Sequence, residues 1–246
     1  MRRLLPLPGA DDVDLDQAYW VSEVGRQHVR GVMVASADGA AQAQGRAGGL
    51  SGPADTAVFA VLRSHAEIIL AGATTVRVEG YAGDQPSTDR RQWRRARGLS
   101  EAPAIAVVTR TCLLDPTSGL FTDTLTRPIV VTHESAPQRR VAALAEVADI
   151  IAVGDGDVDL AAALDVLAER GMRRVSCEGG PTLLSQVAAV GRLDELSLTL
   201  SPLLVGGPAL RILDGPILDP AHRLRLALVL EDDDFLLLRY LSHRAV

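Results

Sequence analysis

Residues 68–80 read IILAGATTVRVEG, and the interpretation of the rest of the chain starts from this short stretch. Residues 68–71 form an apolar run that predicts a buried strand, and small residues follow it. A helix is predicted to begin directly afterwards, so that backbone amides and threonine hydroxyls meet at the junction. Such a junction can hold a phosphate or diphosphate group, and an ordinary strand-to-helix cap is the alternative interpretation.

The same alternation of apolar runs and amphipathic segments extends in both directions from this stretch. Further strands are predicted where Val, Ile and Leu cluster, at residues 28–36, 104–109, 128–132, 149–153, 173–177 and 193–201. Amphipathic or apolar segments predict helices at residues 53–65, 138–147, 158–170 and 181–190, and a short helix is predicted at residues 90–97 within a polar, arginine-rich stretch. Strands that alternate with helices predict a parallel sheet.

The last part of the chain has a different pattern. Residues 224–230 and 235–241 flank an acidic turn and predict an antiparallel hairpin. The whole pattern predicts a three-layer α/β/α domain, whose sheet is mostly parallel and has an antiparallel C-terminal hairpin. We expect residues 1–27 to be an irregular lead-in and residues 28–246 to form one domain.

The composition excludes several kinds of chemistry. The chain has 246 residues and a formal net charge of −6, and every basic side chain is an arginine. Without lysine there can be no Schiff-base or pyridoxal-phosphate enzyme and no lysine-bearing phosphate loop. The acidic balance disfavours nucleic acid as a partner, and no apolar run approaches the ~18 residues of a membrane helix. Two widely separated cysteines, Cys112 and Cys177, favour a reducing cytoplasm over a disulfide framework.

The triplet His65-Ala66-Glu67 matches the histidine and glutamate of a zinc-dependent nucleoside deaminase. Such a site also needs two further cysteine ligands in a Pro-Cys-x-x-Cys motif, which the chain lacks. We therefore interpret the triplet as a helix end that leads into a strand, and we predict no metal site.

Two other segments follow predicted strands, where ligands of open α/β sheets bind. Ser36-Ala37-Asp38-Gly39 places a carboxylate after the strand of residues 28–36, although a simple turn explains the same residues. Residues 177–184 read CEGGPTLL, in which two glycines permit close backbone approach before a helix N-terminus that favours an anion. This is not the six-position dinucleotide fingerprint, so a standard Rossmann site is not supported.

Four segments in this order resemble the C-terminal reductase domain of the riboflavin-biosynthesis protein RibD, which has a dihydrofolate-reductase-like fold. The segments are ASADG (35–39), LRSHAEIILAGATTVRVEG (62–80), EGGPTLL (178–184) and LDELSLTLSPLLVGG (193–207). The resemblance extends from about His28 to Leu241. It implies an NADPH-dependent reductase that forms a homodimer.

The resemblance also implies roles for individual residues. Asp38 and Glu79 are the candidate acids, and Ser51, Arg63 and Glu178 would contact the substrate. The residues implied to bind NADPH are Thr75, Thr109, Arg110, Gly179, Gly180, Pro181, Thr182 and Leu183. Arg110 falls where the family holds the 2′-phosphate, and an arginine fork suits that group.

The expected reaction is the reduction of 5-amino-6-(5-phosphoribosylamino)uracil, in which a hydride reaches C1′ of the ribose. A dihydrofolate or other pteridine reductase, and a non-catalytic NADPH-binding protein, are the alternatives. The chain departs from the family after Glu79, where Gly80-Tyr81-Ala82-Gly83 replaces a second acid, a proline and a nearby arginine. The arginines that could hold a substrate phosphate come later, in residues 90–97, and whether residues 81–102 form a lid stays open.

Overall fold

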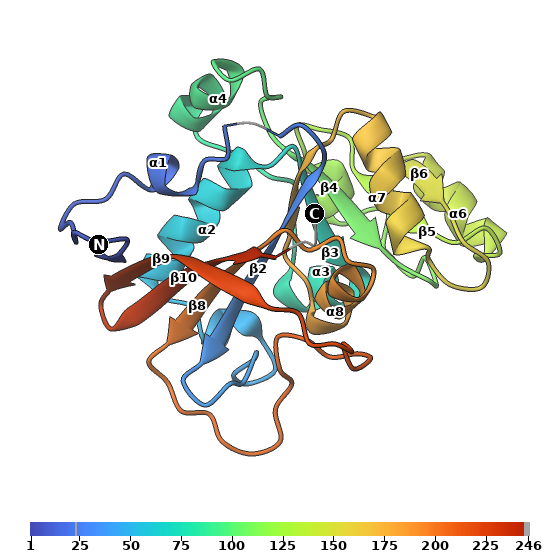
Figure 1. Cartoon of the computed structure of the whole chain (residues 1–246). Coiled ribbons are helices and arrows are strands. Elements are labelled where there is room, and N and C mark those ends of the chain that lie inside the picture. Colours follow the sequence, from blue (N-terminus) through green and yellow to red (C-terminus); the bar gives the residue numbers. More distant parts are fainter. Residues whose placement is uncertain (23, 244–246) are drawn as a thin grey trace. The chain divides into compact units, whose positions relative to one another are not determined.

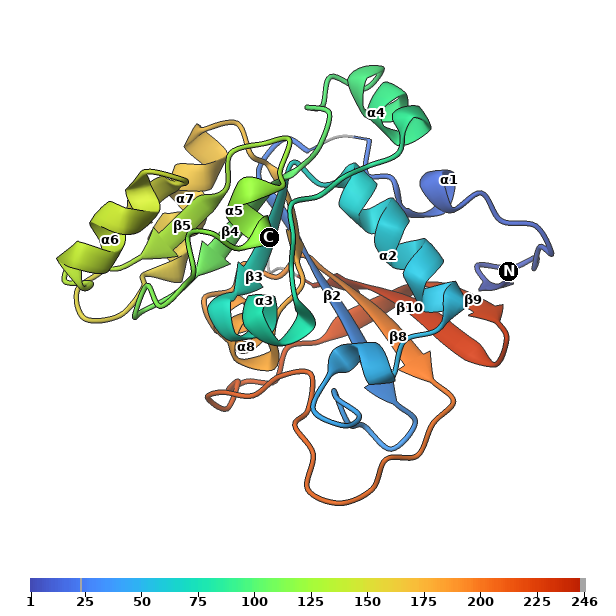
Figure 2. The same cartoon turned by 180° about the vertical axis from the view of Figure 1, so that it is seen from behind.

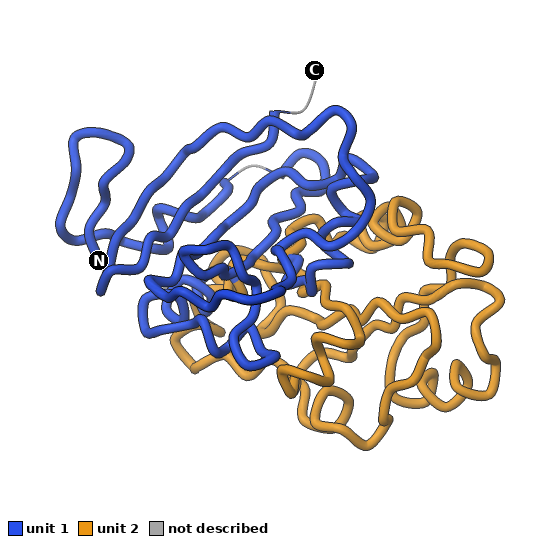
Figure 3. The backbone as a smooth tube through the Cα atoms, turned by 90° about the horizontal axis from the view of Figure 1, so that it is seen from below, with its two compact units in different colours: residues 1–62, 177–246 blue, residues 63–176 orange. Residues whose placement is uncertain are grey.

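The computed structural model describes residues 1–22 and 24–243. The chain forms two compact units (Figure 3). Unit 1 contains residues 1–62 and 177–246, and unit 2 contains residues 63–176. The chain therefore leaves unit 1 once and returns to it, and the division does not coincide with the expected boundary between residues 27 and 28.

Unit 2 is built on parallel strands. The order is β7 (Arg174–Cys177), β3 (Ile68–Gly72), β4 (Ala104–Val108), β5 (Ile129–Thr132) and β6 (Asp149–Ala152) (Figure 1). Strands β3 to β6 pair in parallel, with Gly72 opposite Val108 and Val108 opposite Val131. Its helices are α3 (Ala73–Glu79), α4 (Thr88–Arg95), α5 (Gly119–Thr122), α6 (Gln138–Ala145) and α7 (Leu160–Glu169).

The strands of unit 2 are apolar on both faces. Ile69 in β3 and Val107 in β4 pack with residues of α3, α5 and α6 in one core cluster. The alternate residues Ile68 and Leu70 are equally buried, at 0% exposure. Burial on both faces explains why these strands are continuous apolar runs in the sequence rather than alternating patterns.

Unit 1 combines antiparallel and parallel strands. The order is β1 (Arg2–Leu5), β9 (Leu224–Asp232), β10 (Phe235–Ser242), β8 (Glu195–Ser201) and β2 (His28–Ser36). The pairs from β1 to β8 are antiparallel, whereas β8 and β2 are parallel. The other elements are α1 (Leu15–Tyr19), the 3-10 turn η1 (Ala47–Gly49), α2 (Pro53–His65) and α8 (Pro181–Ala189).

Helices cover both faces of the unit 1 strands. Helix α2 lies over one face (Figures 1 and 2), and its Val58 and Leu62 belong to one core cluster with residues of β9 and β10. On the other face α8 comes so close to β2 that a Cβ on Gly31 would lie 2.7 Å from Cδ1 of Leu184. The unit thus has three layers, and glycine at position 31 permits the close approach of α8.

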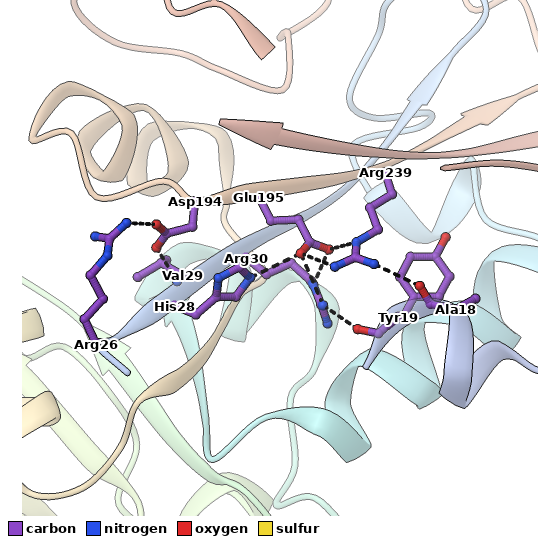
Figure 4. A network of polar contacts seen from close by, with 9 residues as sticks. All are labelled: Ala18, Tyr19, Arg26, His28, Val29, Arg30, Asp194, Glu195 and Arg239. Carbon is purple, nitrogen blue, oxygen red and sulfur yellow. Dashed lines mark hydrogen bonds and ion pairs between the residues drawn. The ribbon is translucent and has the colours of Figure 1, made fainter. Parts of the chain in front are cut away.

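A buried ionic network joins the first helix to the strands (Figure 4). The Glu195 carboxylate, with a fully buried side chain, accepts hydrogen bonds from Arg30 Nε at 2.6 Å and Arg239 Nε at 2.9 Å. The same two arginines donate to the carbonyl oxygens of Tyr19 and Ala18. The network therefore fixes the end of α1 to β2, β8 and β10.

The predicted order of elements is confirmed. Helix α2 occupies residues 53–65 as expected, the parallel strands lie where the apolar runs are, and β9 and β10 form the predicted hairpin. The expectation of an irregular lead-in is wrong for two segments, because β1 pairs with β9 and α1 is helical. The signal for α1 is Asp14, whose side chain accepts from the amide of Gln17 as an N-cap.

Candidate functional site

The predicted site residues of unit 2 gather at the carboxyl ends of its parallel strands. Strand β3 ends at Gly72, and α3 follows at once with Thr75 in its first turn. Strand β4 ends beside it, because Gly72 pairs with Val108, and Thr109 follows directly. The structure therefore brings Thr75, Thr109 and Arg110 to one edge, as the ends of neighbouring parallel strands require.

Thr109 and Arg110 play different parts in the turn after β4. The Thr109 hydroxyl is buried and accepts a hydrogen bond from the amide of Cys112 at 3.1 Å, so it shapes the turn. The Arg110 side chain is 68% exposed, and its Nε lies 3.7 Å from Oδ1 of Asp157. A surface ion pair of this kind contributes ~0–1 kcal/mol, so Arg110 can exchange Asp157 for an anionic ligand at little cost.

His133 supports this turn and was not among the predicted residues. It follows β5, is buried, and its Nε2 lies 3.0 Å from the carbonyl oxygen of Arg110. Its Nδ1 lies 3.0 Å from Oγ of Ser135. The rule that strand ends carry ligand residues would have pointed to it, since it follows β5 as Arg110 follows β4.

Arg63 and Glu79 are also in unit 2, and Glu79 lies one helical turn after Thr75 on α3. Nη1 of Arg63 lies 3.3 Å from Oδ1 of Asp84, and its guanidinium carbon lies 5.1 Å from the centre of the Tyr81 ring. Glu79 is the last residue of α3 and is half-buried. Gly80 ends the helix in the left-handed conformation, with φ at 71°, which turns the chain toward Tyr81.

Asp38, in unit 1, is tied to a distant loop. Its Oδ2 accepts a hydrogen bond from the amide of Gly206 at 2.7 Å, and its Oδ1 accepts from the amide of Val205 at 3.2 Å and from the Ser36 hydroxyl. Backbone hydrogen bonds also join Ala37 to Leu203, so the loops after β2 and β8 lie side by side (Figure 2).

These donors stabilise the charged form of Asp38. The Ser36 hydroxyl and the amides of Gly206 and Val205 stabilise the carboxylate and lower its pKa to about 2. Asp38 is therefore ionised at neutral pH and has no proton to donate in this conformation. The lowered pKa favours Glu79 over Asp38 as the proton donor.

The other predicted residues of unit 1 flank two helix N-termini. Ser51 lies two residues before α2, and its hydroxyl donates to Oδ2 of Asp55, the third residue of that helix, at 2.5 Å. Glu178 follows β7 and is buried at 7% exposure. Both positions are therefore structurally constrained.

The glycine pair makes a compact entry into α8. Gly179 has φ at 78°, its peptide bond to Gly180 is cis, and a Cβ on it would lie 3.1 Å from Sδ of Met33 in β2. Gly180 is the N-cap, Pro181 follows at the first helical position, and no side chain caps the helix. The first-turn amides of Thr182 and Leu183 therefore lack the side-chain acceptor that a capping residue would give them.

The predicted site residues thus lie in both units. Among residues 1–22 and 24–243 there is no cluster of three His, Cys, Asp or Glu side chains that could hold a metal ion. The hydrogen-bond donors are backbone amides, hydroxyl groups and arginines, which suit an anionic organic ligand, and the carboxylates are acceptors.

Comparison with known families identifies the group to which the chain is related. The family described as RibD C-terminal domain matches residues 27–237. The chain belongs to this family. The resemblance seen in the four sequence segments is therefore confirmed.

Curated relatives of this member of the RibD C-terminal domain family include two proteins that are both named 2,5-diamino-6-ribosylamino-4(3H)-pyrimidinone 5′-phosphate reductase. The protein of Methanothermobacter thermautotrophicus is 32% identical over 181 residues, which cover 73% of this chain and 80% of that protein. The protein of Archaeoglobus fulgidus is 30% identical over 146 residues, which cover 59% of this chain and 66% of that protein.

Solved structures support the fold. A pyrimidine reductase-like protein of Corynebacterium diphtheriae has a TM-score of 0.85 and 25% identity, and the match covers 95% of this chain and all of that one. The riboflavin biosynthesis reductase Rib7 of Saccharomyces cerevisiae has a TM-score of 0.66 and 17% identity, covering 93% and 95%. The predicted reductase fold, with its mostly parallel strands and antiparallel hairpin, is confirmed.

None of the helices in the part of the chain that the structure describes is long and apolar enough to span a membrane.

Proposed function

We propose that this protein is an NADPH-dependent reductase of a ribosylamino-pyrimidine 5′-phosphate. The 32% identity to the M. thermautotrophicus reductase, over 80% of that protein, carries the proposal. The curated relatives are named for the diamino-pyrimidinone form, and the amino-uracil form expected from the sequence carries the same ribosylamino phosphate. Both forms are therefore candidate substrates.

The donor set fits a dinucleotide. The glycine turn before α8 has no side chain that would block a diphosphate, and the first turn of α8 offers amides to it. The exposed guanidinium of Arg110, at the edge that also carries Thr75 and Thr109, suits the 2′-phosphate that distinguishes NADPH from NADH. If Arg110→Ala left the NADPH/NADH preference unchanged, this assignment of Arg110 would be withdrawn.

The chemistry needs one hydride and one proton. Bound NADPH would supply the hydride to C1′ of the substrate, whose ribosylamino group has opened to an imine, and the product is a ribitylamino pyrimidine. The chain would supply a proton from the Glu79 carboxyl group to complete the reduction. The ionised Asp38 would fix the loop around Val205 and Gly206 beside the substrate. Ser51, Arg63 and Glu178 would contact the substrate.

Steady-state assays test the function directly. Purified protein is mixed with NADPH and with each pyrimidine substrate or dihydrofolate, and the oxidation of NADPH is followed by absorbance. Turnover of either pyrimidine supports the proposal, and turnover of dihydrofolate alone favours a pteridine reductase. NADPH binding without turnover of any substrate at high enzyme concentration indicates a non-catalytic protein.

Glu79→Gln tests the proton donor. We expect turnover to fall by about 10²-fold or more, as for the loss of a general acid, with little change in NADPH affinity. Unchanged turnover would remove Glu79 from the mechanism.

Three further properties belong to the same proposal. We expect residues 28–246 to act as one reductase domain. We also expect the protein to form a homodimer and to be located in the cytoplasm. Sedimentation at micromolar protein tests the dimer, because a monomeric mass at that concentration would contradict it.

A further inference from the structure

Arg94, in the arginine-rich helix α4, has an unusual position. The chain has arginines at 90, 91, 94, 95 and 97, and such a run is usually solvated. Arg94 is nevertheless 0% exposed and ranks among the largest fully buried side chains of the described residues. A buried guanidinium needs acceptors for its donors, so its partners indicate what it does.

Its partners are carbonyl oxygens at the end of α2. Nη1 of Arg94 donates to Ser64 O at 2.8 Å and to Ala66 O at 2.7 Å, and lies 3.4 Å from Arg63 O. The last carbonyls of a helix lack intrahelical partners and carry its partial negative charge. Arg94 therefore binds the C-terminus of α2 as a capping cation.

The other side of the same guanidinium holds the chain beyond α4. Nε donates to Ser100 O at 2.7 Å, and Nη2 donates to the Ser100 hydroxyl at 3.3 Å. Burial lowers the pKa of Arg94 to about 10, while the charges of Asp84 and Glu67 act against this effect. The group thus stays protonated at neutral pH, and its donors are committed to the protein rather than to a ligand.

Arg63 is the residue through which this arrangement reaches the candidate site. Its carbonyl oxygen faces Arg94, and its side chain, 20% exposed, pairs with Asp84. Asp84 also acts electrostatically on Arg94. The backbone and the side chain of Arg63 are therefore both held by groups in the segment between α3 and β4.

This segment is attached to α2 by an aromatic contact as well. The Trp93 ring stacks on the His65 ring, with centroids 4.9 Å apart and planes 10° apart. The guanidinium of Arg97 lies 3.8 Å from the centre of the same Trp93 ring. Residues 88–102 are thus packed against the end of α2 by a buried charge and a stacked ring, which favours a fixed wall over a closing lid.

We propose that Arg94 is a positioning residue that holds Arg63 in place for the substrate, and that residues 88–102 form a fixed wall behind it. The inference rests on the proposed function, in which Arg63 contacts the ribosylamino-pyrimidine phosphate. It also removes Arg94 from the arginines that could bind the substrate phosphate directly.

A double-mutant cycle tests the link between the two arginines. The variants are Arg94→Lys, Arg63→Gln and their combination. Arg127→Lys is the matched control, since Arg127 also donates to a carbonyl oxygen at a helix end, that of Ala145 in α6, and lies outside residues 90–97. Each is assayed for the KM of the pyrimidine substrate, for kcat and for the dissociation constant of NADPH. Circular dichroism and thermal unfolding establish that each variant is folded at the assay temperature.

We expect Arg94→Lys to raise the substrate KM about tenfold, equivalent to about 1.4 kcal/mol, with kcat and NADPH binding changed less than about twofold. In the Arg63→Gln background the same change should raise KM less than about twofold, because residues that act through one another are not additive. Arg127→Lys should leave KM as in the wild type. Equal increases in both backgrounds, or an unchanged KM, would overturn the proposal.

An NMR measurement on the wild-type protein keeps the proposal testable if Arg94→Lys does not fold or if neither pyrimidine is reduced. With nitrogen-labelled arginine, the Arg94 and Arg63 guanidinium groups should both give sharp, slowly exchanging signals. The Arg63 signal is identified by its absence from the spectrum of the Arg63→Gln variant. A rapidly averaged Arg63 signal would refute the positioning role whatever the substrate. If the Arg63 signal shows a fixed guanidinium but the protein reduces neither pyrimidine, the result counts against the proposed function and not against the positioning role.

Discussion

Glu195→Gln should destabilise unit 1 strongly, because it removes the carboxylate at the centre of a buried network. Arg30 and Arg239 approach this carboxylate at 2.6 and 2.9 Å, and Nε2 of His28 lies 3.1 Å from Oε2. The side chains of Arg30 and Arg239 are only 7% and 16% exposed. A neutral glutamine would leave two guanidinium charges in the protein interior without their counter-ion.

The magnitude follows from this burial. Removing one partner of a buried ion pair costs ~3–5 kcal/mol, because the remaining charge stays desolvated. For a chain of this size each kcal/mol lowers Tm by roughly 2–4 °C, so the expected decrease is about 6–20 °C. Glu231→Gln is the matched control in the same unit, since its partner Arg2 is 60% exposed and such surface pairs contribute ~0–1 kcal/mol.

The pH dependence provides an independent check on the same group. Burial alone would raise the pKa of Glu195, but Arg30, His28 and Arg239 hold it well below the usual value of 4.5. A carboxylate whose pKa is lowered by folding adds stability above its unfolded pKa, and this stability is lost as the pH falls. The wild type should therefore lose stability below about pH 4.5 more steeply than Glu195→Gln.

Urea unfolding followed by circular dichroism, for the wild type and both variants at several pH values, measures these differences. If Glu195→Gln cost no more than Glu231→Gln at neutral pH, the network would not contribute as the geometry requires.

Three further outcomes are expected. Asp38→Asn should leave the shape of the pH–rate profile between about pH 5 and 9 unchanged, because a carboxyl group with a pKa of about 2 does not titrate there. If the variant lost the acidic or the basic limb of that profile, Asp38 would be assigned as an acid of the reaction. Gly31→Ala should cost ~1–3 kcal/mol in urea unfolding, because its Cβ would meet Leu184, whereas Gly25→Ala, with open space around it, should not. Burial raises the pKa of the Cys177 thiol to about 12, so a thiol reagent should modify it only after unfolding, and fast native labelling would contradict its burial.

The elements of secondary structure could be predicted where the local pattern was strong. Pro53 and the apolar residues after it predicted α2 with its observed bounds, because these signals lie within the helix itself. Strand β1 was missed, since its four residues alternate between exposed and half-buried and its partner β9 lies more than 200 residues away. A short strand of this kind is stabilised by its pairing, which no local window contains.

The candidate site was predicted only in part for the same reason. The family resemblance implied Thr109 and Arg110, which the structure has directly after β4, and the rule that ligands bind at strand ends would also have found His133 after β5. The burial of Arg94 could not be inferred, because its acceptors at Ser64 and Ala66 lie about 30 residues earlier.

By itself, the sequence determined the order of strands and helices, the family, and the kinds of side chain available for catalysis, with arginine in place of every lysine. These properties are local or compositional, since periodicity and turn residues act over a few positions. The tertiary structure alone decided that the Asp38 carboxylate binds the amides of Val205 and Gly206, which lowers its pKa, and that Arg94 holds α2 rather than a ligand. Charge state and role depend on burial and on hydrogen-bond partners, and folding brings those partners from distant parts of the chain.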